Sequence, residues 1–180
     1  MSSWQYRIIA GIAVLGFVLI LTACDLPAPS YREPLPTSTQ PQSQIQPKGG
    51  PYDEKADPVQ DIAAAFTQAK ADNKYVLLDF GANWCLDCRV LSNYYATDPV
   101  KSLLAKSYHL VLIDVGNFDT HLDVVGKYGN PIENGIPALV ILDPAGHMLV
   151  TTKAGEFADA RSMSAQQVLD FLQKWAPKQG

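Results

Sequence analysis

The sequence has no excess of basic residues and only a few histidines and cysteines. It carries 14 Lys and Arg against 18 Asp and Glu, which gives a formal net charge of −4 over 180 residues. Because no basic stripe is present to neutralise phosphates, nucleic acid is not expected as a partner. The three histidines lie singly at His109, His121 and His147, whereas a structural zinc site needs four ligands at short spacings. Nucleic-acid binding and a structural zinc site are therefore both set aside, and no metal site is expected.

The chain also has little that could span a membrane. Its apolar run at residues 8–21, IIAGIAVLGFVLIL, is short of the roughly 20 residues that a spanning helix needs, but it suits the hydrophobic region of a secretory signal peptide. The residues that follow, Leu21-Thr22-Ala23-Cys24, resemble a bacterial lipobox, where the cysteine is lipidated and the preceding peptide is removed. We expect a signal peptide at residues 1–23 and a lipid on Cys24. The alternative is an uncleaved N-terminal anchor, and either one tethers the domain to a membrane outside the cytoplasm.

The segment after the lipobox is rich in Pro, Ser and Gln and has no apolar period. Such a segment cannot bury enough surface to offset the entropy lost on ordering, so residues 24–56, including the lipidated Cys24, are expected to form a disordered tether. Asp25 resembles the signal that retains enterobacterial lipoproteins in the inner membrane. The expected location is the periplasmic side of a bacterial membrane, with the inner membrane favoured.

Hydrophobic patterns from residue 57 onward predict one domain, residues 57–180. Asp57-Pro58 predicts a helix start, and YVLLDF at residues 75–80 predicts a buried strand. Asp143-Pro144-Ala145-Gly146 predicts a hairpin turn. Helices are expected at about 58–73, 85–95, from 100, at 122–128 and at 164–175, and strands at 75–80, 109–115, 138–142 and 148–152. This order predicts an α/β fold with a mixed central β-sheet flanked by helices.

Two cysteines one helical turn apart occur in DFGANWCLDCR, residues 79–89. If Cys24 carries lipid, Cys85 and Cys88 are each other's only disulfide partner in a compartment where disulfides persist. Such a pair can hold a metal ion, form a structural bridge or exchange electrons with another protein. A cysteine at a helix N-terminus meets unpaired N–H groups and the positive end of the helix dipole, which stabilise the reactive thiolate. The position of Cys85 therefore favours electron exchange.

The order of motifs resembles that of the thioredoxin-fold oxidoreductases. Gly135-Ile136-Pro137 follows the cysteines by about fifty residues, and a strand, a turn, a second strand and a final helix come after it. The resemblance covers nearly all of residues 57–174, and residues 77–100 are most similar to the C-terminal thioredoxin-like domain of the DsbD electron carriers. It implies a thioredoxin fold with no cofactor beyond the redox-active disulfide.

The resemblance also implies catalytic roles. Cys85 would attack a partner disulfide, and Cys88 would resolve the mixed disulfide that forms. Asp79 would be a buried acid beneath the pair, with a pKa raised by burial, that takes and returns the Cys88 proton. The alternative for Asp79 is a strand-end aspartate hydrogen-bonded to nearby backbone.

Three more residues are implied to bind the substrate. Pro137 would follow a cis peptide bond, Ile136 would offer its backbone to a bound chain, and Trp84 would be an exposed contact surface. The clients would be oxidised or reduced envelope proteins. A separate membrane donor of DsbD type would supply electrons, since DsbD's membrane domain is absent. The alternative is a non-catalytic adaptor that binds an envelope protein around a structural disulfide.

Two features depart from the family pattern. The residues between the cysteines are Leu86 and Asp87, without the histidine that strong oxidants often carry there. A carboxylate near the Cys85 sulfur disfavours the thiolate, so these residues predict a reducing to intermediate potential. Thioredoxins often place a lysine on the next strand near the buried acid, and in this sequence the matching position is expected to be Leu110. We therefore expect Asp79 to lack a counter-charge.

Overall fold

The computed structural model describes residues 49–178. The expected signal peptide, the lipid on Cys24, the Asp25 signal and residues 24–48 of the tether lie outside the described residues. Between residues 49 and 178, no helix is both long and apolar enough to cross a bilayer. The helices are α1 (Pro58–Asp72), α2 (Leu86–Tyr95), α3 (Val100–Ser107), α4 (Leu122–Lys127), the 3-10 helix η1 (Ala160–Ser162) and α5 (Ala165–Trp175). The strands are β1 (Tyr75–Gly81), β2 (Tyr108–Asp114), β3 (Ala138–Leu142) and β4 (Met148–Thr151).

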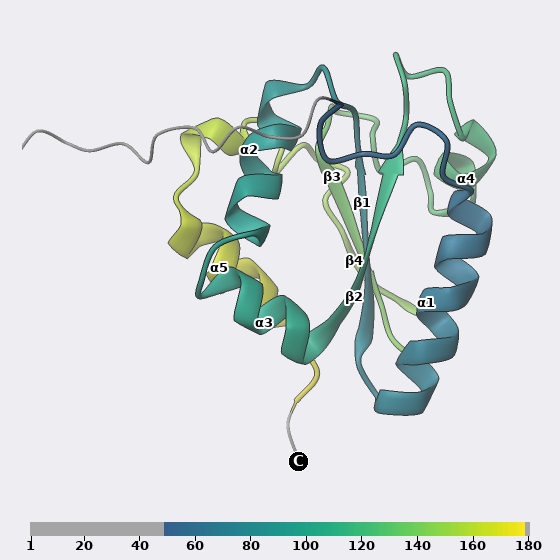
Figure 1. The fold of residues 1–180 in the computed structure, drawn as a ribbon, viewed down its shortest axis with the longest axis vertical. Helices are drawn as coiled ribbons and strands as arrows, with labels where there is room; N and C mark the ends of the chain where they lie inside the picture. The colour runs from purple at the N-terminus through teal and green to yellow at the C-terminus, as the bar shows by residue number, and fades with distance from the viewer. Residues whose placement is uncertain (1–48, 179–180) are drawn as a thin grey trace, which may run out of the picture. The chain divides into compact units, whose positions relative to one another are not determined.

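The strands form one mixed sheet in the order β2-β1-β3-β4. β1 runs parallel to β2 and antiparallel to β3, which in turn pairs antiparallel with β4. The two central strands are buried almost throughout, which explains why they have continuous apolar runs. Helices α1 and α4 lie on one side of the sheet, and α2, α3 and α5 lie on the other (Figure 1). The predicted mixed sheet flanked by helices is confirmed.

A hydrophobic cluster fills the space on each side of the sheet. Because side chains alternate along a strand, Val76 and Leu78 of β1 belong to one cluster and Leu77 belongs to the other. The first cluster also contains Cys85 and Cys88. The cysteine pair is therefore part of the packed core, at one end of the central strand.

Side-chain caps set the start of α1 and α5, and the sequence predicts the first of these helix starts at Asp57. Its carboxylate accepts hydrogen bonds from the backbone N–H groups of Val59 and Gln60, with Pro58 in the first helical position. At the other end of the domain, Ser164 and Gln167 form a capping box that starts α5. Helix η1 and a cis peptide bond between Asp98 and Pro99 were not expected from the sequence.

Residues 49–56, which we call the N-terminal strap, pack against the domain and correct the expected tether boundary. Tyr52 is only 3% exposed and belongs to the same cluster as the cysteines. Its backbone N–H donates to Asn83 Oδ1 at 2.9 Å, and Asn83 Nδ2 donates back to the Tyr52 carbonyl at 2.8 Å. A single aromatic residue among Gly, Pro and charged residues shows no period, so this packing could not be predicted from the sequence. The domain therefore begins before the expected residue 57.

Candidate active site

The two cysteines lie at the start of α2 and form a disulfide bond. Cys85 is the N-cap residue, and its sulfur accepts a hydrogen bond from the backbone N–H of Cys88 at 3.2 Å. Cys85 is 5% exposed, whereas Cys88 has no exposed surface. Of the two cysteines, only Cys85 therefore keeps a small exposed surface, which favours it as the residue that meets an incoming thiolate.

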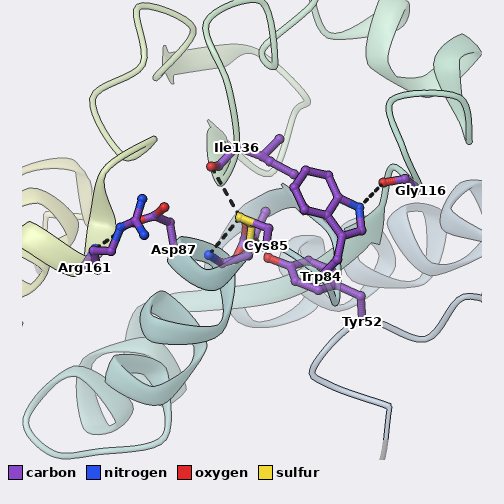
Figure 2. The surroundings of a disulfide bond; sticks show 9 residues. Tyr52, Trp84, Cys85, Asp87, Gly116, Ile136 and Arg161 are labelled. Carbon is purple, nitrogen blue, oxygen red and sulfur yellow. Dashed lines mark hydrogen bonds and ion pairs between the residues drawn. A yellow bond between two sulfur atoms is a disulfide. The ribbon is translucent and has the colours of Figure 1, made fainter.

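The segment before β3 faces the disulfide. The Ile136–Pro137 peptide bond is cis, as predicted, and the Ile136 carbonyl oxygen lies 3.5 Å from Cys85 Sγ (Figure 2). In the oxidised state the sulfur has no proton to donate, so this is a contact; in the reduced state the Cys85 thiol can donate to the same oxygen. The Ile136 backbone thus lies beside the sulfur that a substrate must approach.

Trp84, the residue before Cys85, has an exposed side chain. Its indole Nε1 donates to the Gly116 carbonyl at 2.8 Å, and its ring meets Phe118 in an edge-on contact with centroids 6.0 Å apart (Figure 2 shows the first contact). Trp84, Leu86 and Phe118 are 57%, 52% and 43% exposed. Because its indole is fixed by Gly116, Trp84 offers a positioned apolar surface next to the reactive sulfur. Phe118 was not identified from the sequence.

An acidic cavity adjoins Trp84. It has a volume of about 440 Å³ and is lined by the carboxylates of Glu54, Asp114 and Asp119 among others. Burial raises the pKa of Asp114, and the neighbouring carboxylates of Glu54 and Asp119 raise it further. The charge on this side of the site is negative and opposes the approach of acidic segments.

Asp79 lies on β1, two residues before Gly81, and has no exposed surface. Burial raises its pKa to about 7, against the opposing effect of a hydrogen bond from the Tyr52 hydroxyl to Asp79 Oδ1 at 3.2 Å. The Tyr95 hydroxyl also interacts with this carboxyl group and lowers its pKa. However, neither Tyr95 Oη nor Asp79 Oδ2 has a partner in hydrogen-bonding geometry among the described residues. The raised pKa predicted from the sequence is confirmed, and the alternative of a backbone-bonded aspartate is not supported by the hydrogen bonds around it.

The residue beside Asp79 on the next strand is Leu112, because the register of β1 and β2 pairs Leu110 with Leu77. The expected position of Leu110 is therefore wrong by two residues. The consequence is unchanged, since the groups that shift the Asp79 pKa are two tyrosines and include no cation among the described residues. The hydroxyl of Tyr52 is the polar partner of the buried acid, and the sequence analysis did not identify it.

Asp87, which lies between the two cysteines in sequence, is held in an ion pair with Arg161. Its side chain is 6% exposed. Oδ1 accepts a hydrogen bond from the Arg161 backbone N–H at 2.9 Å and lies 3.3 Å from Arg161 Nε (Figure 2). The nearby guanidinium offsets part of the negative charge that Asp87 brings to the Cys85 region. The sequence analysis did not identify Arg161 as the partner of this carboxylate.

No group of three or more potential metal ligands occurs between residues 49 and 178. Two of the histidines pair with carboxylates instead: His109 Nε2 lies 3.0 Å from Asp72 Oδ1, and His147 Nδ1 lies 2.8 Å from Asp143 Oδ2. Each of these two imidazole rings therefore lies beside one carboxylate side chain.

Comparison with known proteins adds a family to this geometry. A family model described as thioredoxin-like matches residues 57–144, a range that includes both cysteines and Pro137. Thioredoxin from Buchnera aphidicola is 34% identical over 100 residues, and the match covers 55% of this chain and 76% of that protein. A disulphide isomerase of known crystal structure from Xylella fastidiosa is 45% identical with a TM-score of 0.69, covering 71% of this chain and 97% of that chain.

A third relative is much longer than the matched region. The thiol:disulfide interchange protein DsbD 1 of Pseudomonas aeruginosa is 28% identical over 94 residues, which cover 47% of this chain but 14% of that protein. The chain therefore spans only a small part of DsbD 1. The N-terminal strap, residues 49–56, lies outside the family match.

Proposed function

Because the chain belongs to the thioredoxin-like family and is a thiol-disulfide oxidoreductase, we propose that it reduces disulfides of envelope proteins while tethered to a bacterial membrane. One observation carries the proposal: a disulfide at a helix N-terminus in which Cys85 keeps a small exposed surface and Cys88 has none. This arrangement lets an external thiol or disulfide react at one defined atom. A purely structural bridge has no need of it.

The first step is the attack of reduced Cys85 on a client disulfide. The Cys85 thiolate forms a bond to one client sulfur as the client's S–S bond breaks, and the electron pair leaves on the other client sulfur. The N–H groups of the first turn of α2 and the helix dipole stabilise the attacking thiolate. In this structure the backbone N–H of Cys88 already points at the Cys85 sulfur at 3.2 Å.

The second step releases the client. Cys88 attacks the Cys85 sulfur of the mixed disulfide, the Cys85–client bond breaks, and the client leaves as a second thiolate. The enzyme pair is now oxidised and the client disulfide is reduced. Cys88 must lose a proton to react, and Asp79, with a pKa of about 7, is suited to accept that proton at neutral pH.

Substrate binding would use the two surfaces that flank the exposed sulfur. The Ile136 backbone, 3.5 Å from Cys85 Sγ, offers a strand-like edge to an extended client segment. The indole of Trp84 and the side chain of Leu86, both more than half exposed, provide apolar contact around it. Backbone pairing of this kind selects extended or unfolded segments more than particular sequences, which suits a protein with many clients.

The proposed direction is reduction, with electrons delivered by a separate membrane protein of DsbD type. The residues between the cysteines include no histidine, and the carboxylate of Asp87, though paired with Arg161, adds no stabilisation to a thiolate. We expect a potential below about −180 mV, nearer to thioredoxin than to strong oxidants. The description of the Xylella relative as a disulphide isomerase favours disulfide correction over cytochrome c maturation as the use of these electrons.

The location rests on the N-terminal sequence. The apolar run at residues 8–21 and the lipobox that ends at Cys24 support export and lipidation, and Asp25 supports retention in the inner membrane. A Cys24→Ala variant would then leave the membrane fraction while keeping its activity towards soluble disulfides. A protein that stays in the membrane fraction after this change would instead be held by an uncleaved anchor.

The decisive experiment is to trap partners in cells with a Cys88→Ser variant. Without the resolving sulfur, mixed disulfides on Cys85 accumulate, and both the electron donor and the clients can be identified by mass spectrometry. Cys85→Ser is the matched control and should trap nothing, because Cys88 is fully buried. Full cellular function in a double Cys85→Ser, Cys88→Ser variant would contradict the enzyme and favour a non-catalytic adaptor.

A further inference from the structure

The N-terminal strap brings a tyrosine side chain under the active site from outside the matched family region. Asn83, in the loop between β1 and α2, holds both the N–H and the carbonyl of Tyr52, at 2.9 Å and 2.8 Å. The same amide donates to Glu54 Oε1 at 3.1 Å. Three hydrogen bonds thus fix the strap to the loop that precedes Cys85, which leaves the Tyr52 ring little freedom.

The Tyr52 hydroxyl occupies a space that exists because residue 81 is glycine. A Cβ atom on Gly81 would lie 2.1 Å from the Tyr52 hydroxyl oxygen and 3.0 Å from Cys88 Sγ. The hydroxyl and the Cys88 sulfur therefore both border the same small space at the end of β1. Figure 2 shows the Tyr52 ring reaching from the strap towards the disulfide.

From this space the hydroxyl donates to Asp79 Oδ1 at 3.2 Å. Among the described residues, this is the one hydrogen bond that the Asp79 side chain accepts, because Asp79 Oδ2 has no partner. Burial, together with the Asp79 charge, raises the pKa of Tyr52 well above its ordinary value. The phenol therefore remains a hydrogen-bond donor throughout the neutral range.

We propose that Tyr52 is a positioning residue for the proton transfer of client release, and that its hydroxyl holds Asp79 in the carboxylate form that accepts the Cys88 proton. The inference rests on the proposed function and adds the residue that controls the buried acid. In the step concerned, Cys88 Sγ bonds to Cys85 Sγ, the Cys85–client bond breaks with its electron pair on the client sulfur, and the Cys88 proton passes to Asp79. The proton returns to solvent before the next cycle.

Among the groups around Asp79, Tyr52 has the main influence on the ionisation of the carboxyl group. The strap contributes Tyr52, α2 contributes Tyr95, and the paired residues on β2 and β3 are Leu112 and Leu139. The Cys88 sulfur borders the space at Gly81 that the Tyr52 hydroxyl fills. Tyr95 interacts with the carboxyl group without a formed hydrogen bond. Removing the Tyr52 hydroxyl would leave the charged form of Asp79 without a formed hydrogen bond, so the carboxylate would form only at higher pH.

The test compares Tyr52→Phe with the wild type in the full chain. The variant keeps the ring and loses only the hydroxyl. The Asp79 carboxyl titration, followed by ¹³C NMR in the oxidised protein, should move up by about one pH unit, because a hydrogen bond to a charged group is lost. In single-turnover reduction of a disulfide peptide, client release should slow about tenfold at pH 6 and recover at high pH.

Tyr108→Phe is the matched control. Tyr108 is also a buried tyrosine, but its hydroxyl donates to the Leu172 carbonyl at 2.7 Å and has no contact with Asp79. Its removal should leave the Asp79 titration and the pH profile unchanged. A Tyr52→Phe titration that coincides with the wild type, or a loss of rate that is equal at every pH, would overturn the inference. Failure of the wild type to reduce any disulfide would instead overturn the proposed function, and the NMR titration keeps the two outcomes apart.

Discussion

Arg161 engages one oxygen of Asp87 with both its backbone and its side chain. The backbone N–H lies 2.9 Å and the guanidinium Nε 3.3 Å from Asp87 Oδ1. The residues are 74 positions apart in sequence, so this pair joins η1 to the first turn of α2. The loop before α5 is thereby tied directly to the residue between the two active-site cysteines.

This pair predicts opposite effects for its two partners on the reactivity of Cys85. Arg161→Gln leaves the Asp87 carboxylate unopposed and should lower the rate at which reduced Cys85 reacts with iodoacetamide at pH 7 by about two- to threefold. Asp87→Asn removes the negative charge and should raise that rate by a similar factor. Arg161→Lys, which keeps both the charge and the backbone bond, is the control. Equal rates in all the variants would show that the pair is structural only.

The buried carboxyl group of Asp79 predicts that stability falls as pH rises. Its pKa is about 7 in the folded protein against an ordinary value of 3.8, so the folded state binds more protons than the unfolded state between these values. The unfolding free energy of the oxidised protein should therefore fall through this range, and Asp79 alone should account for about 4 kcal/mol between pH 4 and pH 8.

Asp79→Asn isolates that contribution, because asparagine does not titrate. The difference in unfolding free energy between variant and wild type should shift by about 4 kcal/mol in favour of the variant from pH 4 to pH 8. Chemical denaturation at both pH values measures it. A difference that does not change with pH would mean that the pKa of Asp79 is not raised in the folded protein.

The close approach of Tyr52 to Gly81 predicts the effect of a single added methyl group. Because a Cβ on Gly81 would lie 2.1 Å from the Tyr52 hydroxyl oxygen and 2.4 Å from the ring, Gly81→Ala should push Tyr52 out of its site. The protein should lose about 1–3 kcal/mol of unfolding free energy, and limited proteolysis should cut within residues 49–56. The control is Gly126→Ala in α4, where an added Cβ meets nothing within 4 Å. Resistance of the Gly81→Ala strap to protease would contradict the contact.

The buried hydroxyl group of Thr152 contacts β3, the strand that follows the cis-proline, and its removal should lower the stability of the protein. Thr152 Oγ1 accepts the backbone N–H of Leu139 at 2.7 Å, with both residues buried. Thr152→Val keeps the shape of the side chain but leaves that N–H unpaired, so the unfolding free energy should fall by about 1–3 kcal/mol. Thr151→Val is the neighbouring control: its buried hydroxyl has no partner among the described residues, and its loss should be neutral or stabilising. Equal effects of the two changes would contradict the assignment.

The parts of the site that lie close in sequence could be predicted from the residues alone. Cys85 and Cys88 are one turn apart at the start of a helix, and Asp79 stands six positions earlier in an apolar strand. The strand, the helix start and the burial of the acid follow from these short-range patterns. The cis Ile136–Pro137 bond was predicted from the resemblance and not from any local pattern.

The residues that adjust the site could not be predicted, because they arrive from distant positions without a pattern of their own. Tyr52 is a lone aromatic residue in a polar segment, 27 positions from Asp79. Arg161 lies in a 3-10 helix of three residues, too short to show a period. The register that places Leu112 beside Asp79 depends on how two strands pair, which a single chain does not reveal.

The position of the strap affects how this enzyme should be produced for study. The family match begins at residue 57, so a fragment trimmed to that residue would retain both sulfurs and every strand while losing the phenol that fills the space under Cys88. In that fragment the carboxyl group of Asp79 would border the empty space that the Tyr52 side chain fills in the full chain. Rate constants and potentials measured on such a fragment would belong to a different catalyst from the one that the full chain builds.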